Sequence, residues 1–276
     1  MKKRVIILTG SELRHDFFRK LFALDPEIDV IQTFCEGTEK SLSAFIEKET
    51  DTVMRLKHLK AREESEKDFF NVFVKTSKDL SNPVFLPKGE INNLRYTEKI
   101  INLKPDLIIA YGCSLIKEPL LSAFPKRFLN VHLGLSPYYR GSGTNYWPLV
   151  NNEPEFVGAT FMYIDAGIDT GDIIHQIRAR ITWGDTPSSI GNRLIKDIIP
   201  TYQAIVKNVD SLRTMPQPKV PDDEKVCKQK DYDEKSVEKL YNNFNNGMVE
   251  KYLSEINERL QKSPIVENPS LTDLLK

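Results

Sequence analysis

Two short, wholly apolar runs, each followed closely by glycine, constrain the fold of this chain most. The first is residues 5–8, stopped by Thr9 and Gly10, and the second is residues 107–111, followed by a polar loop at residues 112–114. Runs of this length that are apolar on both faces are typical of strands buried inside a parallel sheet. Parallel strands need helical crossovers, so we expect an α/β fold whose binding loops follow the carboxyl ends of the strands.

The sequence around these runs alternates strand and helix. After the first run, apolar residues recur at helical spacing over residues 13–22, with Ser11 as the expected cap, and residues 29–34 suit the next strand. This strand-helix-strand unit predicts an open, mostly parallel sheet with helices on both faces. The further expected strands are residues 128–133, 157–164 and 173–182, and the further expected helices are residues 94–103 and 187–206.

One segment interrupts this alternation with a different composition. Residues 47–67 are dense in Lys, Arg and Glu, and few apolar residues lie among them. We expect one or two long, solvated helices here, inserted into the fold at about residues 38–77. A charged helix face is usually exposed to solvent, so we expect this insertion to take no part in the chemistry.

The composition shifts again near the end of the chain. After the proline-rich residues 215–219 the sequence holds many Lys, Glu and Asn, and residues 236–260 suit helix with a break at Gly247. We therefore predict a main domain over residues 1–206 and a mainly helical extension over residues 207–276.

Charge and cysteine usage argue against several classes of protein. The chain has 276 residues, and 39 basic residues balance 39 acidic ones, which argues against a protein that binds nucleic acid by neutralising phosphates. The three cysteines, Cys35, Cys113 and Cys227, are far apart and form no metal-binding or disulfide pattern. We expect reduced thiols in a cytoplasmic protein. No apolar run approaches the ~20 residues of a membrane helix, so we expect no membrane partner.

The candidate site lies in the middle of the chain. Asn130 and His132 are two residues apart on one expected strand, so their side chains share a face. Asp169 follows the next strand, in a loop flanked by Gly167 and Gly171. An amide donor, an imidazole and a carboxylate suit the stabilisation of a tetrahedral oxyanion and the movement of protons. No nucleophilic serine or cysteine motif is present, so direct attack by a substrate amine fits these groups better than a covalent enzyme intermediate.

The segments around these residues resemble the folate-dependent formyltransferase family. The resemblance covers about residues 1–205, and it rests on Asn130-x-His132, Leu135-Ser136-Pro137, Arg140-Gly141 and residues 168–173. That family includes methionyl-tRNA formyltransferase, glycinamide ribonucleotide transformylase and the nucleotide-sugar N-formyltransferases. The resemblance implies a Rossmann-like fold, 10-formyltetrahydrofolate as the formyl donor, and a formyltransferase domain at residues 1–206. The charged segment at residues 38–77 departs from the compact family core.

The resemblance also implies roles for individual residues. Asn130 and a protonated His132 would stabilise the oxyanion, and Asp169 would keep His132 charged. The expected folate-pocket residues are Tyr111, Gly112, Cys113, Ser114, Leu115, Ile164, Asp165 and Gly167. The expected acceptor-binding residues are Gly10, Ser11, Arg14, Arg140, Gly141 and Tyr146.

The acceptor is less constrained than the reaction. The acidic residues of the extension argue against tRNA, so we expect a small-molecule amine, with a nucleotide-linked amino sugar preferred and methionyl-tRNA as the alternative. A metal-dependent hydrolase using His132 and His175, and a non-catalytic folate-binding protein, are rivals from other classes. We expect no metal at the site, and we leave open a homodimer and the role of the charged insertion.

Overall fold

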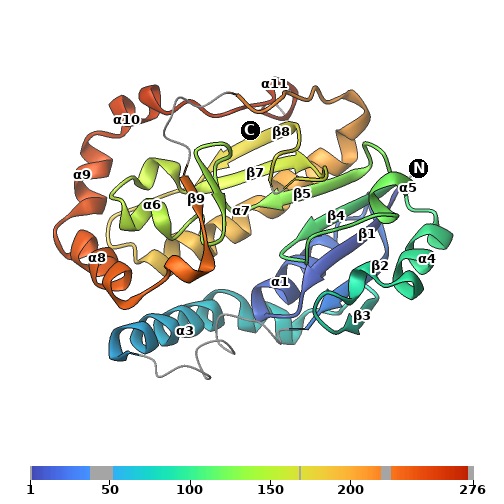
Figure 1. The fold of residues 1–276 in the computed structure, drawn as a ribbon, viewed down its shortest axis with the longest axis horizontal. Helices are drawn as coiled ribbons and strands as arrows, with labels where there is room; N and C mark the ends of the chain where they lie inside the picture. The colour runs from blue at the N-terminus through green and yellow to red at the C-terminus, as the bar shows by residue number, and fades with distance from the viewer. Residues whose placement is uncertain (1, 38–51, 168, 219–224, 273–276) are drawn as a thin grey trace.

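The computed structural model describes residues 2–37, 52–167, 169–218 and 225–272, and its centre is a seven-stranded sheet (Figure 1). The strands lie in the order β3-β2-β1-β4-β5-β7-β8. All neighbouring pairs from β3 to β5 are parallel, and the pairs β5–β7 and β7–β8 are antiparallel. The strand bounds are Lys3–Gly10 (β1), Ile28–Glu36 (β2), Pro83–Leu86 (β3), Leu107–Tyr111 (β4), Phe128–His132 (β5), Gly158–Tyr163 (β7) and Ile173–Arg178 (β8). The predicted α/β class with a mostly parallel sheet is confirmed.

Helices cover both faces of this sheet. The α-helices are α1 (Leu13–Phe22), α3 (Val53–Thr76), α4 (Leu94–Leu103), α5 (Leu120–Ala123), α6 (Trp147–Val150), α7 (Pro187–Asn208), α8 (Glu234–Asn245), α9 (Met248–Ser254), α10 (Ile256–Lys262) and α11 (Pro269–Thr272). Short 3-10 turns lie at Glu90–Asn92, Pro154–Phe156, Val209–Ser211 and Gln229–Asp231. A second, two-stranded sheet pairs β6 (Tyr139–Gly141) with β9 (Lys225–Cys227).

The alternation of side chains along the central strands builds two cores. Val5 and Ile7 of β1 face a core that includes Phe18 of α1 and residues of α7, whereas Ile6 and Leu8 face a smaller core that includes Ile100 of α4. All four β1 side chains are fully buried. This explains why the first apolar run has no polar alternation, since a strand covered by helices on both faces has no solvent side.

The charged segment is packed more closely than the sequence predicts. Residues 53–76 form one continuous helix, α3, which contacts α1, α7 and α8. Phe70 of α3 is fully buried, and its ring centroid lies 4.6 Å from that of Phe17. A few apolar residues spaced along one face are enough to anchor a helix that is otherwise charged. The expected residues 38–51 of this insertion lie outside the described residues.

Three local predictions differ from the structure. Glu12, not Ser11, is the N-cap residue of α1, and His15 closes that turn by accepting the Glu12 backbone N–H at Nδ1, 3.2 Å away. Strand β3 was not expected, because Pro83 indicates a loop. It lies at the edge of the sheet, where a proline at the first strand position is tolerated. The last strand ends at Arg178, four residues before the predicted end.

The C-terminal helices return along the main sheet. Leu240, Met248 and Tyr252 belong to the same core as β1 and α7, and α8 packs against α3 and α6. Beyond α10 the chain reaches β8, where the backbone N–H of Gln176 donates to the carbonyl oxygen of Val266 at 2.8 Å. In the described parts of the chain, no helix combines the length and apolar character that crossing a membrane requires.

Candidate active site

Two cavities meet at the carboxyl edge of the central strands. The larger has a volume of about 680 Å³ and the smaller about 250 Å³. Cys113, Asn130 and Asp169 line both cavities, and His132 lines the larger one. A donor molecule in one cavity and an acceptor molecule in the other would therefore face each other across these side chains.

The strand order brings the site residues together. Strands β4 and β5 are parallel neighbours, with Ala110 opposite Asn130, so the loop after β4 lies next to the end of β5. Strand β7 pairs antiparallel with the other side of β5, so its last residue, Tyr163, lies opposite Leu129 near the start of β5. The loop that follows β7 carries Asp169 back along β5 to His132, beside the carboxyl edge where open α/β sheets bind their ligands.

His132 and Asp169 are in direct contact. Nδ1 of His132 lies 3.2 Å from Oδ2 of Asp169, and their side chains are only 9% and 14% exposed. Asp169 adopts a left-handed backbone with φ of 53°, a conformation that aspartate tolerates better than most residues. The carboxylate of Asp165 is used within the same loop instead, since it accepts the N–H of Gly167 at 2.9 Å and the hydroxyl of Thr170 at 2.7 Å.

Gln217 holds the Asp169 loop in place. Its side-chain amide donates to the carbonyl oxygens of Asp169, at 2.7 Å, and Gly171, at 3.0 Å. The oxygen of the same amide accepts a hydrogen bond from Nη2 of Arg140 at 3.0 Å. Arg140 therefore supports the loop through Gln217, and among the described residues it lines neither cavity. Nothing in the sequence near position 217 indicated this role, because the contact is made only in the folded chain.

Burial controls the protonation of His132. Removal of the ring from water lowers the pKa of His132, and the neighbouring Asp169 carboxylate opposes this effect without overcoming it. Burial therefore works against the charged ring that the resemblance implies, and the Asp169 carboxylate works for it. In a neutral ring that donates from Nδ1 to Asp169, Nε2 carries no proton and can accept one.

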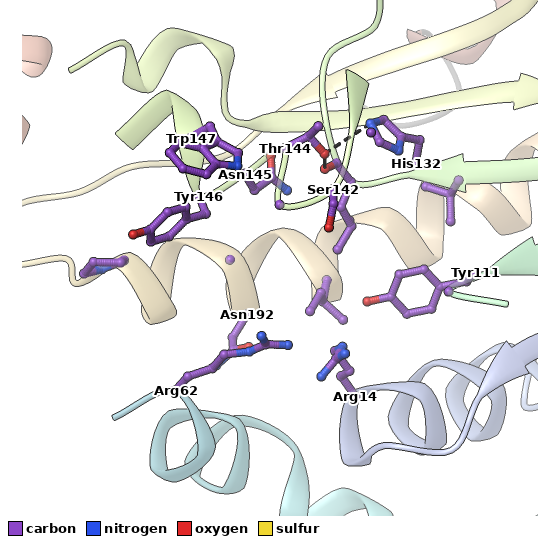
Figure 2. A pocket seen from close by; sticks show the side chains of 18 of the residues that line it. Arg14, Arg62, Tyr111, His132, Ser142, Thr144, Asn145, Tyr146, Trp147 and Asn192 are labelled. Carbon is purple, nitrogen blue, oxygen red and sulfur yellow. Dashed lines mark hydrogen bonds between the residues drawn. The ribbon is translucent and has the colours of Figure 1, made fainter. Parts of the chain in front are cut away.

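Thr144 is a second partner of His132 that the sequence analysis missed. Its hydroxyl oxygen lies 3.1 Å from Nε2 of His132, and the same hydroxyl donates to the carbonyl oxygen of Leu133 (Figure 2). A hydroxyl can donate to the neutral ring, or accept from the protonated ring while it donates to Leu133. Thr144 can therefore hold His132 in one orientation in both protonation states.

This geometry makes Thr144 a positioning residue with a specific test. We expect Thr144→Val, which keeps the shape but removes the hydroxyl, to lower kcat about tenfold, the effect of roughly one hydrogen bond. KM should stay within about twofold, since no new group reaches the cavity. Thr144→Ser retains the hydroxyl and should restore kcat. Steady-state kinetics of the three proteins checks this, and equal kcat values for the Val and Ser variants would contradict it.

The loop after β1 is filled by a side chain. The ring of His15 lies so close that a β-carbon at Gly10 would be 2.6 Å from it and one at Gly112 would be 2.5 Å from it. Both glycines are needed for this close approach. Among the described residues, Gly10 and Ser11 do not line either cavity, whereas Arg14, on the next turn of α1, lines the larger one.

Helix α3 contributes residues to the larger cavity that the sequence analysis assigned to solvent. His58, Arg62 and Glu66 recur every fourth residue, so they share one helical face, and all three line the cavity. The expectation that this helix is solvated is therefore wrong for that face, where His58 and Glu66 are buried. The spacing was the available signal, but the charged residues on all sides of the helix concealed it.

The remaining predicted residues divide between the two cavities. Ser114, Leu115, Ile164, Asp165 and Gly167 line the smaller cavity, together with Cys113. Tyr111 and Gly112, expected in the same pocket, line the larger cavity instead, as do Gly141 and Tyr146. Among the described residues, no three His, Cys, Asp or Glu side chains converge to hold a metal ion. His175 lies elsewhere, where its Nδ1 accepts the backbone N–H of Asn268 at 2.9 Å.

Comparison with known proteins identifies the relatives of this chain. The family model described as Formyl transferase matches residues 53–202. Methionyl-tRNA formyltransferase of Desulforamulus reducens is 34% identical over 148 residues, which are 52% of this chain and 44% of that protein. The chain thus matches less than half the length of this relative. The family match includes α3, so the expectation that the charged segment departs from the family core is wrong for residues 53–77.

Solved structures share the fold at lower identity. Phosphoribosylglycinamide formyltransferase from Anaplasma phagocytophilum has a TM-score of 0.53 and 14% identity, covering 80% of this chain and 97% of that one. An N-formyltransferase from Helicobacter canadensis, solved with folinic acid and dTDP-3-aminofucose, has a TM-score of 0.52 and 17% identity, covering 84% of this chain and 73% of that one. At such identities these two structures support the fold alone.

Proposed function

The chain belongs to the formyl transferase family, and we propose that it transfers a formyl group from 10-formyltetrahydrofolate to a primary amine. The observation that carries this proposal is the meeting of two cavities at Asn130 and Asp169, with His132 beside them. A group-transfer enzyme needs such an arrangement, because its two substrates must come into contact at the reacting atoms.

The smaller cavity is the proposed donor site. Its lining includes the apolar residues Leu115, Ile116, Met162 and Ile164, together with residues of the loops after β4 and β7. This combination suits a flat ring that stacks on apolar surface and bonds to backbone groups at its edge. The folate supplies the formyl group when it is bound there.

The three site residues then have distinct proposed roles. The amine nitrogen forms a bond to the formyl carbon while the bond from that carbon to the folate nitrogen breaks. The Asn130 amide donates to the formyl oxygen, where negative charge develops. Neutral His132 accepts the proton that the amine loses, and this proton finally reaches the folate nitrogen. Asp169 orients the ring through Nδ1 and stabilises its charge while it carries the proton.

Two acceptors are candidates, and different observations support them. One sequence relative is a methionyl-tRNA formyltransferase, which favours methionyl-tRNA over the nucleotide-linked amino sugar preferred from the sequence. The walls of the larger cavity support the small acceptor, because α3 lines it with charged side chains and Tyr146, Trp147 and Tyr232 line it with aromatic ones. The chain also has no net positive charge that would favour tRNA.

A direct assay tests the transfer and separates the acceptors. We expect the protein to release tetrahydrofolate from 10-formyltetrahydrofolate, followed by absorbance, only when an amine acceptor is present. The amines tested are nucleotide-linked amino sugars and charged initiator methionyl-tRNA, with the matching hydroxyl-bearing nucleotide sugar as the control. If methionyl-tRNA is the only amine that is formylated, methionyl-tRNA is the acceptor and the amino sugar is rejected. Donor breakdown at the same rate with and without every amine would contradict formyl transfer.

A further inference from the structure

The far end of the larger cavity is lined by two arginines that approach from different helices. Figure 2 shows Arg14 of α1 and Arg62 of α3 pointing toward the same space, opposite Ser142 and Tyr146. His132 lies apart from them in the same view. Two guanidinium groups remote from the reacting atoms indicate a part of the cavity that binds the acceptor without taking part in the chemistry.

A buried carboxylate links the two arginines and makes them unequal. Oε1 of Glu66 accepts from Nη1 of Arg14 at 2.9 Å and from Nε of Arg62 at 3.3 Å. Arg14 also pairs with Glu12, so its charge is offset twice. Arg62 donates to Glu66 through Nε alone, and its terminal nitrogens have no partner among the described residues. Its side chain is 36% exposed, whereas that of Glu66 is 11% exposed. Arg62 is thus held in place at its Nε and has its outer donors available to a ligand.

A second observation points to a missing acceptor beside these arginines. The hydroxyl of Tyr111 is buried and has no hydrogen-bond partner within the described parts of the chain. In Figure 2 this hydroxyl points toward the same space as Arg14. A buried donor without a partner destabilises the folded chain, so its presence points to a ligand atom that accepts from it.

Aromatic side chains form the adjoining wall. The ring centroids of His58 and Tyr146 are 5.7 Å apart, and those of Tyr146 and Tyr232 are 5.4 Å apart. All three residues line the cavity, as does Lys228. A planar ring can pack against such a wall while a charged group beside it reaches Arg62.

We infer that Arg62, supported by Glu66 and Arg14, binds a phosphate group of the acceptor, and that the His58 face of α3 is the specificity-determining wall of the cavity. This inference rests on the proposed function, because it takes the occupant of the cavity to be the acceptor. A phosphate offers several oxygens in a tetrahedral arrangement, enough for both terminal nitrogens of Arg62 and for the Tyr111 hydroxyl. A nucleoside diphosphate and the phosphodiester groups next to the aminoacylated 3′ end of a tRNA both carry this chemistry.

Binding of inorganic pyrophosphate tests the site without any turnover. We expect calorimetry to show that Arg62→Gln binds pyrophosphate at least about tenfold more weakly than the unaltered protein. Arg62→Lys keeps the charge but loses the two parallel N–H donors of the guanidinium, so its affinity for pyrophosphate should lie between those of Arg62→Gln and the unaltered protein. Lys67→Gln is the matched control, because Lys67 is on the same helix with a side chain 55% exposed and pairs with Glu63. No binding to the unaltered protein, or equal loss in the Lys67 and Arg62 variants, would overturn the inference.

A kinetic arm separates failure of this site from failure of the proposed function. With an accepted amine, Arg62→Gln should raise the acceptor KM at least about tenfold and leave kcat within about twofold. An unchanged KM alongside normal formyl transfer would reject the phosphate site and leave the proposed function intact. Competition by a free nucleoside diphosphate, or by a short 3′-terminal tRNA fragment, identifies the source of the phosphate. If neither competes, the phosphate assignment is wrong.

Discussion

Asn130→Ala or His132→Ala will lower kcat roughly 10²–10³-fold, the effect typical of removing one oxyanion donor. Asn130 lies at the junction of the two cavities, and His132 is held between Asp169, at 3.2 Å, and Thr144, at 3.1 Å. Without Asn130, the charge that develops on the formyl oxygen has no donor. Without His132, the proton of the amine has no acceptor. Single-turnover release of tetrahydrofolate measures the chemical step directly.

The control for this prediction is a buried histidine outside the cavities. His175 is 4% exposed and lines neither cavity in the described structure. We expect His175→Asn, which can keep an acceptor near the position of Nδ1, to retain kcat within about threefold. Binding of the folate donor to the Asn130 and His132 variants should be preserved, because the apolar walls of the smaller cavity are untouched. Near-normal turnover in Asn130→Ala would refute the assignment of the site.

Acidification from pH 7 to pH 5 will destabilise the protein, because all four of its histidines are buried. Burial lowers the pKa of each of them. The pKa of His175 is lowered to about 4 by burial, and that of His58 to about 4 by burial together with Arg62. Protonation also breaks hydrogen bonds, since Nδ1 of His15 accepts the Glu12 N–H and Nδ1 of His175 accepts the Asn268 N–H. His58 instead pairs with the hydroxyl of Tyr241 at 3.2 Å.

The sign of this effect follows from proton binding. In the unfolded chain each histidine titrates near pH ~6.5, so below that pH the unfolded state binds more protons than the folded state. Stability is therefore fully present above about pH 6.5 and is lost as the pH falls toward the lowered pKa of the folded state. For His58 and His175 the loss between pH 7 and pH 5 is on the order of 2 kcal/mol each.

Urea unfolding at a series of pH values measures this loss. We expect the free energy of unfolding to fall steeply between pH 7 and pH 5, where most carboxylates are still ionised and contribute little. His175→Asn removes one titrating group, so the free energy of unfolding of this variant should fall less with pH, by about the contribution of one histidine. An equal slope for this variant and the unaltered protein would show that His175 does not titrate in the way its burial implies.

Local sequence patterns predicted the elements that carry the catalytic residues. The buried strand over residues 107–111 is β4 with the same bounds, and the helix expected over residues 187–206 is α7. Asn130 and His132 share a face of β5 because a strand alternates its side chains. Each of these features depends on residues that are close in the sequence, where composition and spacing are informative.

Contacts between distant segments were not predictable in the same way. Thr144, Gln217 and Arg62 were not singled out, because an isolated threonine, glutamine or arginine has no pattern that separates a site residue from a surface residue. Strand β3 was missed because Pro83 indicates a loop, and only its place at the edge of the sheet makes a strand possible there. The glycines at positions 10 and 112 are explained by His15, which fills the space that a β-carbon would need.

The sequence by itself determined the α/β class, the order of the main elements, the family and the presence of an amide and an imidazole on one strand with a carboxylate in a later loop. These features are encoded locally, by apolar runs, helix caps and the spacing of polar residues. Only the tertiary structure decided that the site has two cavities, that α3 lines one of them, and that burial lowers the pKa of His132. Burial and contacts between remote segments cause all three, and both depend on how the whole chain packs.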